Sequence, residues 1–353
     1  QRCGRPICGE CMRPAPVGFQ CPECVAAAAA SMPRPQARRG GISGAIADRV
    51  KFSTWLVFSG LWVTLAYFPI AHMVWGGGLL SGSESGLSSL IFGSTDGAAN
   101  VAPIDFAGGT VVHINAGMAG LVLALVVGKR LGFGKVAMRP HNVPLTMIGA
   151  GMLWFGWFGF NAGSELAADE TAALVWVNTT VATCAAMVGW LLIEKLRDGH
   201  ATSIGAASGV VAGLVAITPA CGALSPMGSI ILGLVAGVLA AYAVGLKFRF
   251  GYDDSLDVVG VHLVAGLWGT VGAGLLSTST GLFYGKGLDQ TIIQIVIALA
   301  SLVITGVVTT DSIAFALVIT MLAVTFIMPE QTNRGKRAQA VCFVSFPDFF
   351  NFD

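Results

Sequence analysis

Long apolar stretches recur along most of this chain, separated by short segments that carry nearly all of its charged residues. An apolar stretch of about 18 to 22 residues can cross a hydrocarbon core roughly 30 Å thick as an α-helix. The pattern therefore predicts eight membrane-spanning helices, over residues 52–74, 107–128, 143–163, 172–193, 203–221, 227–246, 258–278 and 290–310. A further apolar stretch, 312–328, either crosses the membrane or bends along its surface, and the sequence leaves both alternatives open.

The composition supports a polytopic, all-α membrane protein. Hydrophobic residues make up 54% of the chain and charged residues only 11%, against about a quarter charged in ordinary soluble proteins. The net charge of +1 gives no reason to expect a nucleic-acid partner. Lys and Arg gather before the first predicted helix and after the second, fourth and sixth, whereas the alternate connections hold only Lys286. By the positive-inside rule, the N-terminal segment is cytoplasmic and the loop 75–106 is external.

Two histidines lie in matching contexts inside apolar stretches. The segment Asp105 to Gly117 contains Val-His113-Ile-Asn-Ala-Gly, and the segment Asp257 to Gly266 contains Val-His262-Leu-Val-Ala-Gly. His113 lies in the second predicted helix and His262 in the seventh. With four helices between them, the two histidine-bearing helices cross the membrane in opposite directions. This arrangement is typical of an inverted repeat, in which the functional site lies between the halves near the midplane. Ionisable residues inside a span are costly and mark a pathway by default.

Seven motifs together resemble the ammonium transporter (Amt/Rh) family, in order and in predicted topology. They cover about three quarters of the chain, from Gly44 to Thr309, and comprise residues 70–78, 105–117, 129–135, 140–142, 156–164, 218–222 and 257–262. The resemblance implies an inverted-repeat bundle of eleven helices, a homotrimer, and a narrow apolar pore in each subunit. Only eight or nine of those eleven spans have a counterpart here, so we interpret the chain as an N-terminally truncated member.

The resemblance also implies roles for individual residues. His113 and His262 would be the paired pore histidines, Trp75 and Ser164 the external recruitment site, and Phe160 a gate aromatic. Asp105 would be the acidic residue beneath the recruitment site. The implied activity is transport of ammonium or ammonia, with methylammonium as an analogue and no cofactor, and the chain is expected not to be an enzyme.

Physical reasoning on the same residues agrees with that activity. Trp75 ends the first predicted helix, while Phe160 and Ser164 end the third, so all three converge on the external face. An indole face attracts a small cation by roughly 0.5 to 2 kcal/mol. A bare ammonium ion cannot enter a low-dielectric bore unless it loses a proton, because its desolvation costs tens of kcal/mol on Born estimates. Neutral ammonia needs only one or two polar partners, which two neutral imidazoles can supply.

Each of these residues also has a purely structural interpretation. A histidine can simply pack, Trp75 can anchor a helix at the interface, and Phe160 can be core packing rather than a gate. For Asp105, which precedes Gly108 and Gly109, a helix-capping role is favoured over direct ion contact. Asp253 and Asp254 are expected to be solvated in a cytoplasmic loop.

The first residues form a separate, cysteine-rich unit. Cys8, Cys11, Cys21 and Cys24 make two Cys-x-x-Cys pairs, a pattern that predicts a structural Zn²⁺ site. Their surroundings resemble the zinc-binding segment of some rhomboid-type proteases. We therefore divide the chain into a zinc-binding segment (1–25), a linker (26–43), a transporter body (44–310) and a divergent apolar stretch and tail (311–353).

Two other functions were weighed against transport. Gly41-Ile42-Ser43-Gly44 matches the Gly-x-Ser-Gly pattern of rhomboid serine proteases, but Ser43 precedes the first span, where no intramembrane histidine can reach it. An ammonium sensor would share the pore and differ in output, through a cytoplasmic regulatory partner. The sequence favours transport, with the sensor as the alternative.

Overall fold

The computed structural model describes residues 13–15, 18–20, 44–46, 49–50, 52–135 and 140–327. The chain divides into two compact units, Gln1–Arg39 and Gly40–Asp353. In the first unit, strands β1 (Arg13–Ala15) and β2 (Gly18–Gln20) pair antiparallel. The four cysteines of the predicted zinc site lie outside the described residues, as does Ser43.

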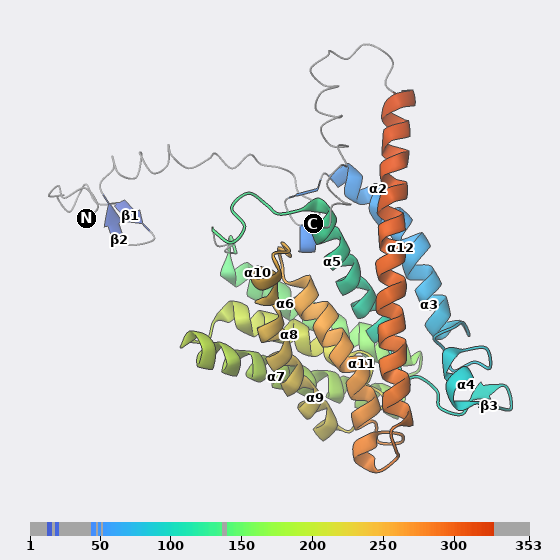
Figure 1. The fold of residues 1–353 in the computed structure, drawn as a ribbon. Helices are drawn as coiled ribbons and strands as arrows, with labels where there is room; N and C mark the ends of the chain where they lie inside the picture. Colours follow the sequence, from blue (N-terminus) through green and yellow to red (C-terminus); the bar gives the residue numbers. More distant parts are fainter. Residues whose placement is uncertain are drawn as a thin grey trace. The chain divides into compact units, whose positions relative to one another are not determined.

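The second unit is a bundle of helices (Figure 1). Among the described residues, seven helices are long and apolar enough to cross a membrane, and Ser203–Ile217 is a shorter apolar helix. These eight correspond one to one with the predicted spans, which confirms a polytopic helical fold. The elements are η2 (Gly44–Ile46), α2 (Phe52–Trp62), η3 (Val63–Tyr67), α3 (Phe68–Trp75), η4 (Gly109–Ile114), α5 (Asn115–Val127), α6 (Val143–Asn161), η5 (Ala162–Glu165), α7 (Glu170–Asp198), α8 (Ser203–Ile217), α9 (Pro226–Ala243), α10 (Leu246–Phe250), η6 (Val259–Val264), α11 (Ala265–Leu276), η7 (Leu282–Tyr284) and α12 (Asp289–Ile327).

The long connection after α3 has structure of its own. It contains the short helix α4 (Leu87–Phe92) and a hairpin of β3 (Ser94–Thr95) with β4 (Ala98–Ala99). It then leads through Asp105 into η4, so this connection ends directly at the segment that carries His113.

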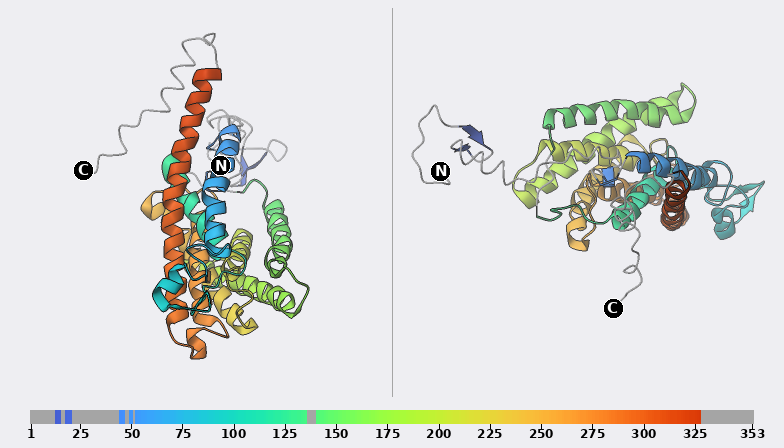
Figure 2. Two further views of the ribbon diagram at one scale, coloured as in Figure 1. Left: turned by 90° about the vertical axis from the view of Figure 1, so that its right-hand side faces the viewer. Right: turned by 90° about the horizontal axis from the view of Figure 1, so that it is seen from above.

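Helix α12 is continuous over 39 residues. At 1.5 Å per residue it is about 58 Å long, roughly twice the thickness of a hydrocarbon core. The apolar stretch after residue 312 therefore extends the preceding helix instead of folding back, because residues 307–327 contain neither Gly nor Pro to break it. The left view of Figure 2 shows α12 (red) as one straight element, and it packs along α2, α5 and α11.

Small residues let the central helices approach closely. Helix α7 packs on α8 and α9. A side chain at Gly233 or Gly237 of α9 would collide with the carbonyl groups of Ala182 and Ala186 in α7. Such contacts hold helices together in a bilayer, where apolar burial supplies no driving force.

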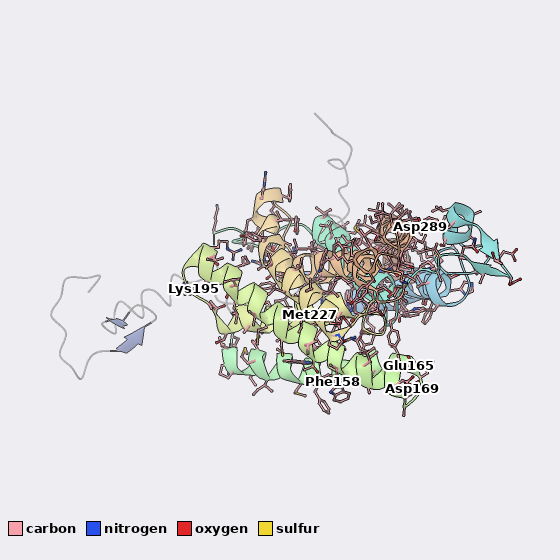
Figure 3. The ribbon with its side chains drawn as sticks, turned by 90° about the horizontal axis from the view of Figure 1, so that it is seen from below. Phe158, Glu165, Asp169, Lys195, Met227 and Asp289 are labelled. Carbon is pink, nitrogen blue, oxygen red and sulfur yellow. The ribbon has the colours of Figure 1, made fainter. Side chains whose placement is uncertain are left out.

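Helix α7 also shows the charge asymmetry expected of a spanning helix. It begins after Asp169 and has Lys195 and Arg197 in its last turn. Figure 3 labels Asp169 and Lys195 at its opposite ends. Acidic groups at the start and basic groups at the end complement the helix dipole.

Candidate functional site

The two histidines of the matched motifs lie side by side. The Nδ1 atoms of His113 and His262 are 3.3 Å apart, and the ring centroids are 5.5 Å apart. His113 is 1% exposed and His262 is partly buried. Since the two residues come from different halves of the chain, only the packing of η4 against η6 brings them together.

Each histidine lies in a π-helical turn that follows a buried carboxylate. Asp105 precedes His113 by eight residues and accepts hydrogen bonds from the backbone N–H groups of Gly108 and Thr110, both at 2.9 Å, and of Gly109. Asp254 precedes His262 by the same eight residues and accepts from Val258 at 3.0 Å and Val259 at 2.7 Å. Each carboxylate thus satisfies N–H groups that a helix start leaves unpaired.

Asp254 is therefore the counterpart of Asp105 in the second half, although the matched segment of the sequence begins at Asp257. Asp254 was expected to be solvated but is 1% exposed, and burial raises the pKa of its carboxyl group. Asp257 instead forms an ion pair with Lys247, at 2.6 Å.

Asp253 was also expected to be solvated, and it is fully buried. Its carboxylate pairs with Arg130 at 3.0 Å and with Arg49 at 3.6 Å. Arg49 additionally binds the backbone carbonyl of Asp253, at 2.5 Å, and those of Ala45 and Gly128. A carboxylate can be buried here because two guanidinium groups offset its desolvation. The cluster ties the segment before α2 to the end of α5 and to the loop before η6.

The last glycine of each motif makes the close approach of the two halves feasible. A Cβ atom added to Gly117 would lie 2.6 Å from the Cα of Leu263, the residue after His262. One added to Gly266 would lie 3.0 Å from the Cβ of His113. Each glycine therefore packs against the backbone beside the histidine of the opposite half, which explains why both motifs end in glycine.

Helix α6 surrounds His113 with two aromatic rings. Trp157 stacks on the imidazole, with centroids 5.4 Å apart and planes at 10°, and Phe160 meets it edge-on at 6.1 Å. The indole Nε1 of Trp157 donates to Thr218 Oγ1, at 3.0 Å. We did not assign Trp157 a role from the sequence. Its spacing of three residues from Phe160 puts both on one helix face and could have indicated it.

The residues predicted for external recruitment occupy two helix ends. Trp75, at the end of α3, is 48% exposed, and its indole Nε1 donates to the backbone carbonyl of Asp105, at 2.9 Å. Ser164, in η5, is partly buried, and its hydroxyl donates to the carbonyl of Phe160, at 2.8 Å. Asp105 thus contacts Trp75 through its backbone and caps η4 through its side chain.

The histidine pair retains unused hydrogen-bonding capacity. Among the described residues, the Nε2 atom of His113 is buried without a hydrogen-bond partner. Buried polar atoms in native proteins are nearly always paired. This nitrogen is consequently the group in the pair best able to bind a small polar molecule.

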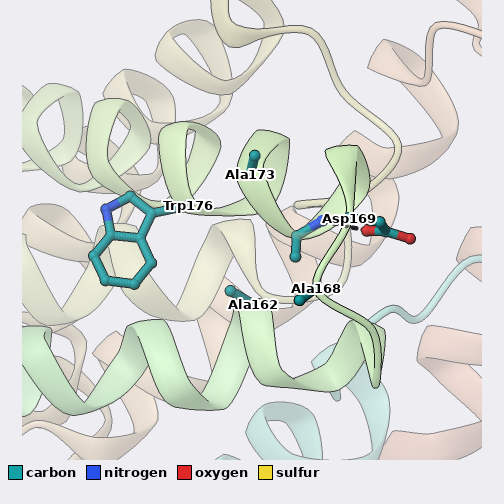
Figure 4. A pocket seen from close by; sticks show the side chains of 6 residues that line it. Ala162, Ala168, Asp169, Ala173 and Trp176 are labelled. Carbon is teal, nitrogen blue, oxygen red and sulfur yellow. Dashed lines mark hydrogen bonds between the residues drawn. The ribbon is translucent and has the colours of Figure 1, made fainter.

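A hollow away from the histidine pair lies between the end of α6 and the start of α7 (Figure 4). Its volume is about 460 Å³, and its walls are four alanines, Trp176 and Asp169. The Asp169 carboxylate already caps α7 by accepting from the N–H of Ala172, at 3.0 Å. Compared with the histidine pair, this hollow offers few polar groups that could bind a ligand.

Comparison with known proteins relates the chain to one family. Residues 38–336 match the model of the Ammonium Transporter Family. That match continues beyond residue 310, where the sequence analysis ended the transporter body. An ammonium transporter from Mycobacterium bovis is 52% identical over 280 residues, which are 76% of this chain and 57% of that protein. One from Aquifex aeolicus is 48% identical over 274 residues, covering 76% and 60% of the two chains.

Solved structures show the same relationship. Mep2 from Candida albicans aligns with a TM-score of 0.66 at 29% identity, over 84% of this chain and 65% of Mep2. A structure titled "Sensor Amt Protein" aligns with a TM-score of 0.66 at 28% identity, over 79% and 68% of the two chains. The chain spans less than two thirds of the length of the first curated relatives that it matches.

Proposed function

Because the chain belongs to the ammonium transporter family, we propose that it moves ammonium or ammonia across a membrane, along a path bordered by His113 and His262. The observation that carries this proposal is the contact between the two buried imidazoles, together with the unpartnered Nε2 atom of His113. These groups suit a small polar molecule that both donates and accepts hydrogen bonds, as ammonia does.

The chemistry of the path follows from desolvation. Trp75 presents a half-exposed indole face, which attracts ammonium from water, and Ser164 supplies a hydroxyl at the end of η5. A charged ion cannot follow into the apolar interior without a large cost, so ammonium releases a proton to solvent water at the half-exposed mouth before the neutral molecule reaches the histidines. Neutral ammonia then moves along the edges of the two rings, where a ring nitrogen such as His113 Nε2 acts as donor or acceptor according to tautomer.

The neighbouring groups support this path in distinct ways. Phe160 and Trp157 cover His113 and act as the gate between the recruitment site and the histidines. Asp105 and Asp254 act structurally, because their oxygens are occupied by the N–H groups of the two helix starts that carry the histidines.

Uptake of methylammonium into proteoliposomes tests the proposal. The wild-type chain should take up methylammonium, and His113→Ala should abolish uptake because a ring nitrogen needed by the neutral molecule is lost. His200→Ala is a matched control, since His200 is exposed in a loop distant in sequence from both motifs. Histidine-independent uptake, or none in the wild type, would contradict the proposal.

A sensor remains a second candidate, favoured by the similarity to the structure titled "Sensor Amt Protein". In that case the same pore would be used, and a cytoplasmic regulatory protein would respond to its occupied state. A variant that loses the cytoplasmic response while retaining uptake would support the sensor. Loss of uptake with an intact response would favour separate roles for pore and signal.

The assembly and location that we propose follow the family resemblance and the charge pattern. The chain forms a homotrimer in the plasma membrane, with its cysteine-rich segment in the cytoplasm. Cys8, Cys11, Cys21 and Cys24 hold a structural Zn²⁺ that takes no part in transport. Family membership supports a transporter and not a protease as the role of the chain.

A further inference from the structure

Gln294 lies in the second turn of the apolar helix α12 and is fully buried. All of its amide hydrogen-bonding groups bind backbone. Its Oε1 accepts from the N–H of Ile104, at 2.8 Å, and its Nε2 donates to the carbonyls of Ile104, at 2.8 Å, and Thr270, at 2.9 Å. A fully satisfied amide in a membrane helix serves to hold other groups in place, because leaving it unpaired would be costly.

The segment that Gln294 holds is the one that supports the recruitment tryptophan. Ile104 directly precedes Asp105, whose backbone carbonyl accepts from the Trp75 indole. Beyond Asp105, the N–H groups of Phe106 and Ala107 bind the carbonyls of Pro219, at 3.0 Å, and Thr218, at 3.2 Å. The short segment is therefore fixed on one side by α12 and on the other by the end of α8.

Gln294 also links this segment to the second half of the chain. Thr270 lies in α11, eight residues after His262. One side chain thus connects the backbone beneath Trp75 to the helix that continues from the second histidine.

We propose that Gln294 is a positioning residue for ammonium recruitment: it fixes the Asp105 carbonyl that orients the Trp75 indole. This inference rests on the proposed function. Loss of the Gln294 amide frees the peptide groups of Ile104, so the Asp105 carbonyl moves and Trp75 loses its orientation. Affinity for the cation falls, whereas the path beyond the mouth is retained.

The kinetic test compares Gln294→Met with Gln290→Met. Gln290 lies one turn earlier on the same helix, is 3% exposed, and donates to the carbonyl of Ala102 at 3.0 Å, three residues before Asp105. Gln294→Met should raise the methylammonium concentration for half-maximal uptake about 5- to 10-fold, the scale expected for a lost buried hydrogen bond, with little change in maximal rate. Gln290→Met should change it less than about twofold. Equal effects of the two variants would overturn the proposal.

A double-mutant cycle with Trp75→Phe separates positioning from general destabilisation. Phenylalanine keeps an aromatic face but cannot donate to Asp105. In that background, Gln294→Met should raise the half-saturating concentration no further, because the link through Asp105 is already absent. Gln294→Glu, which as a protonated acid keeps one donor and one acceptor, should restore part of the affinity. Additive effects, or no rescue, would count against the proposal.

A spectroscopic readout does not depend on transport. The chain contains eight tryptophans, and ¹⁹F NMR after 5-fluorotryptophan labelling identifies the Trp75 resonance by its loss in Trp75→Phe. That resonance should shift or broaden in Gln294→Met and stay unchanged in Gln290→Met. If it shifts while no variant shows histidine-dependent uptake, the proposed function fails and the positioning of Trp75 stands. An unchanged resonance in Gln294→Met refutes the positioning role itself.

Discussion

Replacing Gly117 with alanine should force the two halves of the bundle apart at the histidines. The added methyl group would lie 2.6 Å from the Cα of Leu263 and would also meet its backbone nitrogen. Ordinary contacts of such atoms are roughly 3.5 to 4 Å, so α5 and η6 must separate by about 1 Å. The obstacle is backbone, which cannot turn aside as a flexible side chain could.

The magnitude of the effect follows from this displacement. Overpacking of a tight interior costs about 1 to 3 kcal/mol. A separation of about 1 Å also carries the Nδ1 atoms of His113 and His262 from 3.3 Å to beyond hydrogen-bonding range. Gly117→Ala should therefore lower both thermal stability and the rate of methylammonium uptake.

Two further glycines provide a graded comparison. In Gly266→Ala the added methyl group would lie 3.0 Å from the Cβ of His113, a milder overlap, so the loss of stability and uptake should be intermediate. Gly149→Ala, in α6, meets nothing within 4 Å and should be neutral or stabilising by up to about 1 kcal/mol, since alanine is the better helix former.

Thermal unfolding in detergent, monitored by size-exclusion chromatography, ranks the three variants by Tm. On the scale of soluble domains, each kcal/mol shifts Tm by about 2 to 4 °C. Uptake in proteoliposomes should follow the same order. The reasoning would be refuted if Gly117→Ala had the same Tm as Gly149→Ala and took up methylammonium at the normal rate.

Three other outcomes are expected. Asp253→Asn should destabilise the fold by about 3 kcal/mol or more, because Arg49 and Arg130 lose the buried carboxylate between them; denaturation that matches the wild type would contradict this. Asp254→Asn should flatten the pH dependence of stability. Burial raises the pKa of this carboxyl group in the folded chain, so its contribution is most favourable below the ordinary pKa of about 4 and is lost as pH rises through the raised value; Tm measured from pH 4 to pH 8 should fall less in the variant. Finally, Cys8→Ser should reduce the zinc content determined by mass spectrometry without changing uptake, and equal zinc in both chains would exclude the site.

The membrane architecture could be read from the sequence because its signals are local. The eight spans follow from apolar length alone, and each is a helix in the structure. The pairing of His113 with His262 could be anticipated as well, because both halves carry the same short motif in opposite orientations. The length of helix α12 was harder to predict, since apolar composition does not tell whether a helix continues past the membrane thickness.

The sequence by itself thus determined the eight apolar helices of the described residues, the helical class and the histidine pair. Only the tertiary structure decided which polar groups are buried and what they bind. From the sequence, Asp254 was expected to be a solvated loop residue, but the packing of η6 buries it. Nothing in the sequence indicated that Gln294, in its apolar helix, binds backbone groups of two other segments. The physical reason is that an almost uniformly apolar helix has little contrast between its faces, so its neighbours become known only when the helices are assembled.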